Sequence, residues 1–169
     1  FVHGEHVLPR LAPDGGQFLF HSKQKGGMGV WLARVEGGDP KRLCDGHHAN
    51  WSPDGQKVVL ARGGGIFERA LDADKERRLS PEGLSDCKFP SYLPDGRVLF
   101  VSRAQGKDSL VVAAPDGKAA PEVLAQGEIL SAPRASPDGT VVAFQSGAHL
   151  HLLTVATKAV SQLTTAGGV

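Results

Sequence analysis

Four polar residues stand at matching places in the sequence. Arg10, Asn50, Ser91 and Arg134 each lie three residues before a proline that is followed by Asp-Gly. Two arginines brought together at such positions could bind an acidic group, because a guanidinium forms paired hydrogen bonds with a carboxylate. Alternatively, the four side chains only bond the backbone of neighbouring blades. The pattern predicts a candidate site for an acidic peptide or small anion.

Histidines offer a second kind of chemistry. His47 and His48 lie in the loop just before the strand that carries Asn50, so we expect them near one mouth of the central channel, either in contact with a ligand or partner or as a solvated pair. His149 and His151 alternate, which puts both rings on one face of a strand. A His-x-His pair can bind a metal, but no third ligand is evident in the sequence. We therefore favour packing at His151 and predict neither a metal nor a cofactor.

Motifs of enzymatic catalysis are missing from the chain. The sequence has no Gly-x-Ser-x-Gly elbow for a hydrolase nucleophile and no Gly-x-x-x-x-Gly-Lys-Ser/Thr phosphate loop. The aspartates of the Pro-Asp-Gly phrases form a tempting set of four carboxylates, but each is expected to bond within its own turn. We predict no catalytic residue.

The elements that would position these residues come from a repeat. Its prolines lie 40, 41 and 43 residues apart, and such a period indicates a repeat architecture. Pro, Asp and Gly suit consecutive positions of a type I turn between antiparallel strands. The expected turn residues are Pro13, Asp14, Gly15, Pro53, Asp54, Gly55, Pro94, Asp95, Gly96, Pro137, Asp138 and Gly139.

Each turn is followed by an apolar segment with alternating large side chains. These pairs are Phe18 and Phe20, Val58 and Leu60, Val98 and Phe100, and Val142 and Phe144. The residues between them are apolar too, so we expect all four strands to be buried on both faces. A third strand and a short, charged fourth strand complete each unit, and charge on an outer strand protects a sheet edge.

Four-stranded antiparallel units at this period are typical of β-propeller blades. We predict an all-β fold with no helix and a single propeller domain over residues 1–169. Its four blades should cover approximately 7–46, 47–87, 88–131 and 132–166. The ring is either closed by these four blades alone or left as an arc that a missing segment, a second copy or a partner completes.

Composition restricts the function classes. Lys plus Arg number 19 and Asp plus Glu 18, so the charge balance gives no sign of nucleic-acid binding. No segment is long and apolar enough to cross a membrane. No signal peptide is visible, and we expect either a processed N-terminus or a fragment of a longer chain. Cys44 and Cys87 are interpreted as separate free thiols, with a disulfide between neighbouring repeats as the alternative.

The repeat resembles that of TolB-type propellers, relatives of the WD-repeat class. Trp51-Ser52-Pro53-Asp54-Gly55, the strand after it and the Ile66-Phe67 strand match, as do Gly37-Gly38 and the closing Leu163-Thr164. The resemblance covers almost the whole chain, but four blades and no α/β domain differ from TolB itself. It implies a bacterial periplasmic or extracellular protein that binds another protein or a second copy of itself. The alternative is the accessory propeller of a larger enzyme, such as a prolyl-oligopeptidase-like serine peptidase.

Overall fold

Four separate antiparallel sheets make up the fold. The computed structural model describes residues 6–24, 27–73 and 75–165. Within those ranges it is all-β, with sixteen strands in four sheets of four, each running in sequence order from its inner to its outer strand. The prediction of four four-stranded blades is confirmed. The last residue of the expected fourth blade lies outside the described residues.

The blades are named in chain order. Blade 1 comprises β1 (His6–Leu11), β2 (Gln17–Gln24), β3 (Gly27–Arg34) and β4 (Lys41–Asp45). Blade 2 comprises β5 (His47–Trp51), β6 (Lys57–Arg62), β7 (Gly65–Ala70) and β8 (Glu76–Arg78). Blade 3 comprises β9 (Lys88–Tyr92), β10 (Val98–Ala104), β11 (Lys107–Ala113) and β12 (Glu122–Gly127). Blade 4 comprises β13 (Leu130–Ala135), β14 (Val141–Ser146), β15 (His149–Thr154) and β16 (Val160–Gln162).

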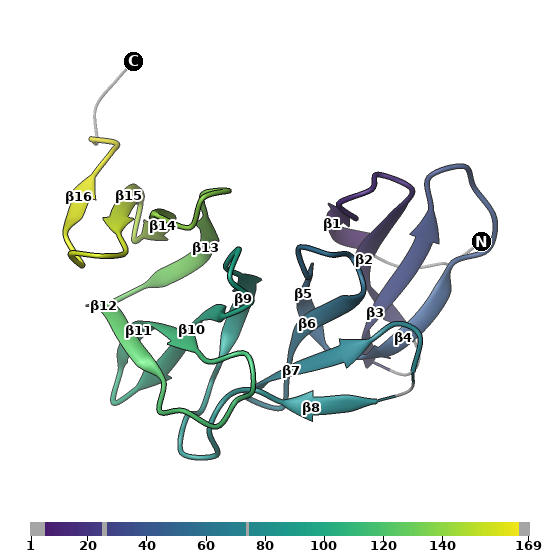
Figure 1. The fold of residues 1–169 in the computed structure, drawn as a ribbon, viewed down its shortest axis with the longest axis horizontal. Helices are drawn as coiled ribbons and strands as arrows, with labels where there is room; N and C mark the ends of the chain where they lie inside the picture. Colours follow the sequence, from purple (N-terminus) through teal and green to yellow (C-terminus); the bar gives the residue numbers. More distant parts are fainter. Residues whose placement is uncertain (1–5, 25–26, 74, 166–169) are drawn as a thin grey trace.

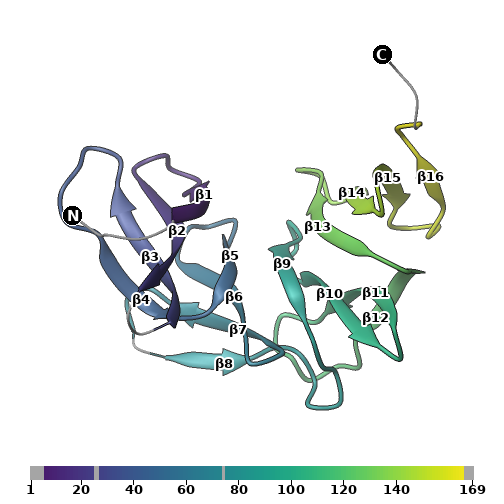
Figure 2. The same ribbon diagram turned by 180° about the vertical axis from the view of Figure 1, so that it is seen from behind.

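The four blades fan around the inner strands β1, β5, β9 and β13 in an open arc. Figures 1 and 2 show blades 1 and 4 at its two ends, with their outer strands well apart. Three apolar clusters of buried residues fill the spaces between successive blades. No such cluster joins blade 4 to blade 1 among the described residues. Of the two arrangements that the sequence left open, the structure has the arc.

The Pro-Asp-Gly turns close the hairpin between the first two strands of each blade. In blade 2 the amide of Gly55 donates to the carbonyl of Ser52 at 3.0 Å. Gly55 has a φ of +71°, a conformation that glycine adopts without strain. The Asp54 carboxylate accepts from the Ser52 hydroxyl at 2.6 Å and from the Gln56 amide at 3.0 Å. This aspartate thus bonds within its own turn.

Alternation along the second strands explains how the blades stack. In β6, Val58 and Leu60 pack toward blade 1, while Val59 and Ala61 pack toward blade 3, and all four are fully buried. We call the face of a blade that points toward the preceding blade its leading face, and the face that points toward the next blade its trailing face. At each internal interface, the trailing face of one blade packs against the leading face of the next. The prediction of strands buried on both faces is correct for this strand and for β10.

The same prediction is wrong for β14. Val142 and Phe144 are buried against blade 3, but Ala143 and Gln145 on the opposite face are exposed. The physical reason is the open arc, since no further blade covers the trailing face of blade 4. Apolar composition alone did not distinguish this strand from its three counterparts.

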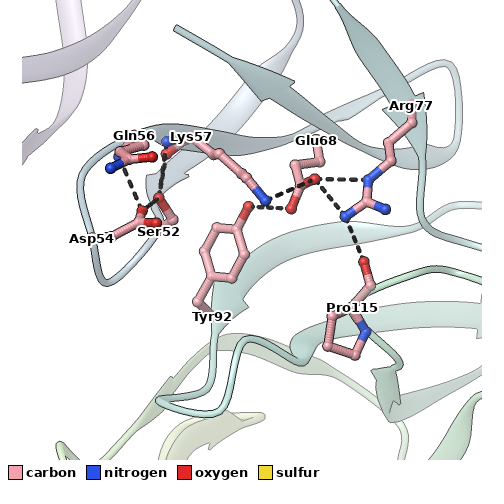
Figure 3. A network of polar contacts seen from close by, with 8 residues as sticks. All are labelled: Ser52, Asp54, Gln56, Lys57, Glu68, Arg77, Tyr92 and Pro115. Carbon is pink, nitrogen blue, oxygen red and sulfur yellow. Dashed lines mark hydrogen bonds and ion pairs between the residues drawn. The ribbon is translucent and has the colours of Figure 1, made fainter.

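Polar contacts reinforce the interface between blades 2 and 3 (Figure 3). Glu68 is only 7% exposed, and its carboxylate accepts from the Tyr92 hydroxyl at 2.9 Å and from Arg77 Nε at 2.7 Å. Arg77 Nη2 also donates to the carbonyl of Pro115 at 2.5 Å. Burial, followed by the charge of Glu68, raises the pKa of Tyr92, so the phenol remains a proton donor. The buried carboxylate is thus paired, as burial requires.

Candidate functional site

The inner strands share a distortion that shapes the centre of the molecule. Leu8, His48, Phe89 and Ala132 each stand five residues before the turn proline, and each has a positive φ between 48° and 56°. The register of each inner strand shifts at this point. Such a bulge bends a strand and redirects its side chains. All four residues are non-glycine, so the repeated strain is held by the surrounding structure.

A hollow of about 60 Å³ lies where the inner strands converge. We call it the central hollow. Its lining comes from all four blades, and it consists of Leu8, Arg10, His21, His48, Ala49, Phe89, Ala132 and Arg134. A water needs roughly 10–15 Å³ on this measure, so the space suits a group of a few heavy atoms. The lining contains no carboxylate.

The two arginines of the hollow are held alike. Arg10 Nη1 donates to the carbonyl of Pro9 at 2.9 Å, and Arg134 Nη1 donates to the carbonyl of Pro133 at 2.8 Å. Burial, and after it the charge of Arg10, lowers the pKa of Arg134. Within the described part of the chain, no ion pair joins either guanidinium to a carboxylate. Two half-buried positive charges thus face the same space without a negative partner.

Two histidines, His21 and His48, line the hollow with the arginines, and His47 contacts His48. His21 is 2% exposed, and its Nε2 accepts from the amide of Ala49 at 2.8 Å, which leaves the proton on Nδ1. The Nδ1 atoms of His47 and His48 lie 2.8 Å apart. Burial, with neighbouring positive groups, lowers the pKa of His21 and of His48 to about 4. Both rings are therefore neutral at pH 7, and the positive charge of the hollow comes from the arginines.

The structure brings together only part of the candidate set. Arg10, His48 and Arg134 line the central hollow, whereas His47, Asn50 and Ser91 lie outside its lining. Asn50 Nδ2 donates to the Ser91 hydroxyl at 3.4 Å, which links blades 2 and 3. This bond runs between two side chains, and not to the backbone of a neighbouring blade as the alternative expected. His47 contacts the ring of His48 at a centroid distance of 4.5 Å.

Sequence reasoning missed residues that line the hollow, among them His21, Leu8, Phe89 and Ala132. His21 follows Leu19 by two positions, so the period of two places it on the same buried face, and that signal was available. The positions of Leu8, Phe89 and Ala132 carried no signal, because the residue types differ and none is glycine. Nothing in these residue types marks the positions as bulges.

The remaining candidates from the sequence are the two cysteines and His151. Cys44 and Cys87 are both free thiols. The His151 ring stacks on Phe144 with a centroid distance of 5.5 Å, which agrees with the packing interpretation. Within residues 6–24, 27–73 and 75–165, no cluster of three potential ligands could hold a metal ion. No helix there could span a membrane.

Comparison with solved structures identifies the fold. TolB from Acinetobacter baumannii superimposes with a TM-score of 0.79 at 19% identity, over 95% of this chain and 44% of that one. A proposed TolB from Agrobacterium tumefaciens gives a TM-score of 0.78 at 23% identity, over 94% of this chain and 63% of that one. The chain has a TolB-type propeller fold. At these identities the likeness concerns the fold alone.

Three further matches come from other proteins. A puromycin hydrolase structure matches this TolB-type propeller with a TM-score of 0.71 at 19% identity, over 94% of this chain and 28% of that one. Among curated sequences, an uncharacterized protein of Agrobacterium fabrum is 34% identical over 115 residues, covering 56% of this chain and 39% of that protein. Tricorn protease homolog 1 of Streptomyces coelicolor is 32% identical over 117 residues, covering 66% of this chain and 10% of the protease. No family model matches.

The chain matches only part of each of these relatives. It spans well under half of the two curated proteins and less than two thirds of the two TolB structures. The likeness to the hydrolase and to the protease concerns 28% and 10% of their lengths.

Proposed function

We propose that this chain is a non-catalytic propeller module that binds another protein in a bacterial envelope or extracellular assembly. The observation that carries the proposal is the exposure of leucine side chains on the two end faces of the arc, against which no blade packs among the described residues. Leu150 on the trailing face of blade 4 is 47% exposed, whereas its equivalents Val30, Ile66 and Leu110 are fully buried. Contiguous exposed apolar surface marks sites of protein interaction.

The leading face of blade 1 also carries an exposed leucine. Leu11 is 66% exposed, but its equivalent Trp51 is 7% exposed and donates from its indole nitrogen to the carbonyl of Arg10. On the neighbouring strands β2 and β3, Phe20 and Trp31 stack with a centroid distance of 6.3 Å, but Phe20 is 8% exposed, so of these three side chains only Leu11 is largely exposed. The two ends thus offer a leading face and a trailing face, which are the two surfaces that meet at every internal interface. Another protein or a second copy of the chain could bind either one.

A test compares matched substitutions at exposed leucines and valines. Leu150→Glu and Leu11→Glu place a charge on the two uncovered faces, whereas Val35→Glu changes a residue that is 55% exposed in the turn after β3. Light scattering and affinity capture would measure self-association and the retention of proteins from a bacterial envelope extract. We expect the two face variants to lose the association and Val35→Glu to keep it. Equal behaviour of all three variants and the wild type would contradict the proposal.

A second candidate function is the accessory propeller of a larger enzyme. It is supported by the similarity to Tricorn protease homolog 1 and to the puromycin hydrolase structure. In that case the uncovered faces would contact the other parts of the enzyme. A reading frame that continues into a serine hydrolase motif would favour this candidate over the first.

A further inference from the structure

The central hollow brings positive charges together in a partly buried space. Two guanidinium groups from opposite ends of the chain face one small space, and the described residues supply no carboxylate to neutralise them. Like charges in a partly buried place repel one another and raise the free energy of the folded state. A negative group in the space would remove that repulsion.

We propose that the central hollow binds a small, doubly charged oxyanion that bridges Arg10 and Arg134. The donors fit this chemistry, since guanidinium groups bind carboxylate and phosphate oxygens through paired hydrogen bonds. A volume of about 60 Å³ suits an oxyanion head group. The proposal stands apart from the uncovered faces, because the hollow lies at the inner strands and the faces lie on the ends of the arc.

The surroundings of the arginines favour an anion as well. Each guanidinium is anchored by one bond to the carbonyl of the proline before it, so other donors remain. His21 and His48 are neutral at pH 7 and neither adds nor removes charge at the hollow. Leu8, Phe89 and Ala132 give apolar walls, which lower the local dielectric constant and strengthen an ionic contact.

The position of the two arginines gives the ligand a structural effect. Arg10 lies on β1 of blade 1 and Arg134 on β13 of blade 4, the two blades that no apolar cluster joins in the described ranges. An anion that contacts both side chains therefore links the first blade to the last. Ligand binding and closer association of the two ends of the arc are coupled, because both depend on the same pair of contacts.

The experiment measures thermal unfolding and direct binding by titration calorimetry at pH 7.5. Sodium phosphate and sodium succinate serve as probes, each against sodium chloride at equal ionic strength. Arg10→Gln and Arg134→Gln remove one donor group each, and the double variant removes both. Arg34→Gln is the matched control, since Arg34 is exposed and lies outside the hollow. Circular dichroism verifies that each variant retains its strands.

We expect saturable stabilisation of the wild type and of Arg34→Gln by at least one of the two dianions. Each single variant should bind the dianion at least about tenfold more weakly than the wild type, because it loses one charge-assisted pair of hydrogen bonds. The double variant should show no saturable binding. Arg10→Lys keeps the charge without the paired donors, so its affinity should fall between those of the wild type and Arg10→Gln.

Several results would overturn the proposal. One is equal stabilisation of the wild type and the double variant, which would be a general salt effect. Another is the lack of any binding of phosphate or succinate by the folded wild type. A third is binding of an acidic hexapeptide alone, lost in the double variant, which would assign the arginines to a peptide site instead of a small oxyanion.

Discussion

Leu79 and Leu163 hold the same place in blades 2 and 4, and their backbone amides form the same bond. Leu79 N donates to Ile66 O at 2.8 Å, and Leu163 N donates to Leu150 O at 2.8 Å. The hydroxyls that follow them also agree, since Ser80 accepts from the Ile66 amide and Thr164 accepts from the Leu150 amide. Yet Leu79 is 1% exposed and Leu163 is 60% exposed.

The comparison separates what a blade does alone from what its neighbour adds. Hydrogen bonds within the sheet form equally well at the end of the arc and inside it, because they need only the strands of one blade. Burial of the side chains needs the next blade. Hydrophobic stabilisation is proportional to apolar area removed from water, so blade 4 gains far less of it than blade 2.

The largest expected effect tests this separation directly. Leu79→Ala should lower the free energy of unfolding by about 2–5 kcal/mol, because it leaves a cavity between blades 2 and 3. Leu163→Ala, the same change at an exposed position, should lower it by no more than about 0.5 kcal/mol. Urea unfolding followed by circular dichroism measures both. Similar losses for the two variants would mean that the trailing face of blade 4 is covered in solution.

The fold could be predicted from the sequence because its signals recur. Four Pro-Asp-Gly turns at a nearly constant period specify the hairpins, and alternating apolar residues such as Val58 and Leu60 specify the buried strands. Each signal is local, and each reports on the blade in which it lies. The same signals describe blade 4 as completely as blade 2, which is why the exposure of Ala143 and Gln145 was not predicted.

The candidate site was predictable only in part. Arg10 and Arg134 were found through their distance from the turn proline, because that repeat position lies on the inner strand of every blade. Asn50 and Ser91 share that position but bond one another between blades, since shorter side chains meet before they reach the hollow. The bulge at Ala132 depends on the strained backbone of a whole strand, and a single residue type does not encode it.

A polar residue at an internal interface gives the second prediction. Burial lowers the pKa of His21 from 6.5 to about 4, so the unfolded chain binds a proton more readily than the folded one. The contribution of neutral His21 to stability is complete above pH 6.5 and is lost as the pH falls toward 4. At pH 5 the loss from this one residue is about 2 kcal/mol.

A variant without the titrating ring isolates the effect. His21→Gln retains an oxygen that can accept from the Ala49 amide but has no group that titrates between pH 5 and 7. Urea unfolding at pH 7 and pH 5 should give a smaller difference for this variant than for the wild type. The same difference in both proteins would show that the acid sensitivity comes from other groups.

The smallest expected effect concerns one hydrogen bond at the internal interface between blades 2 and 3. Tyr92→Phe removes the hydroxyl that donates to the buried Glu68 carboxylate but keeps the ring in the cluster between blades 2 and 3. A hydrogen bond to a charged group contributes about 1.5–3 kcal/mol, and Lys57 and Arg77 still neutralise the carboxylate, so a loss of about 1–2 kcal/mol is expected. A double-mutant cycle with Glu68→Gln measures the coupling between the two side chains. A coupling close to zero would mean that Arg77 and Lys57 satisfy Glu68 without Tyr92, and that the Tyr92–Glu68 hydrogen bond does not help to hold blades 2 and 3 together.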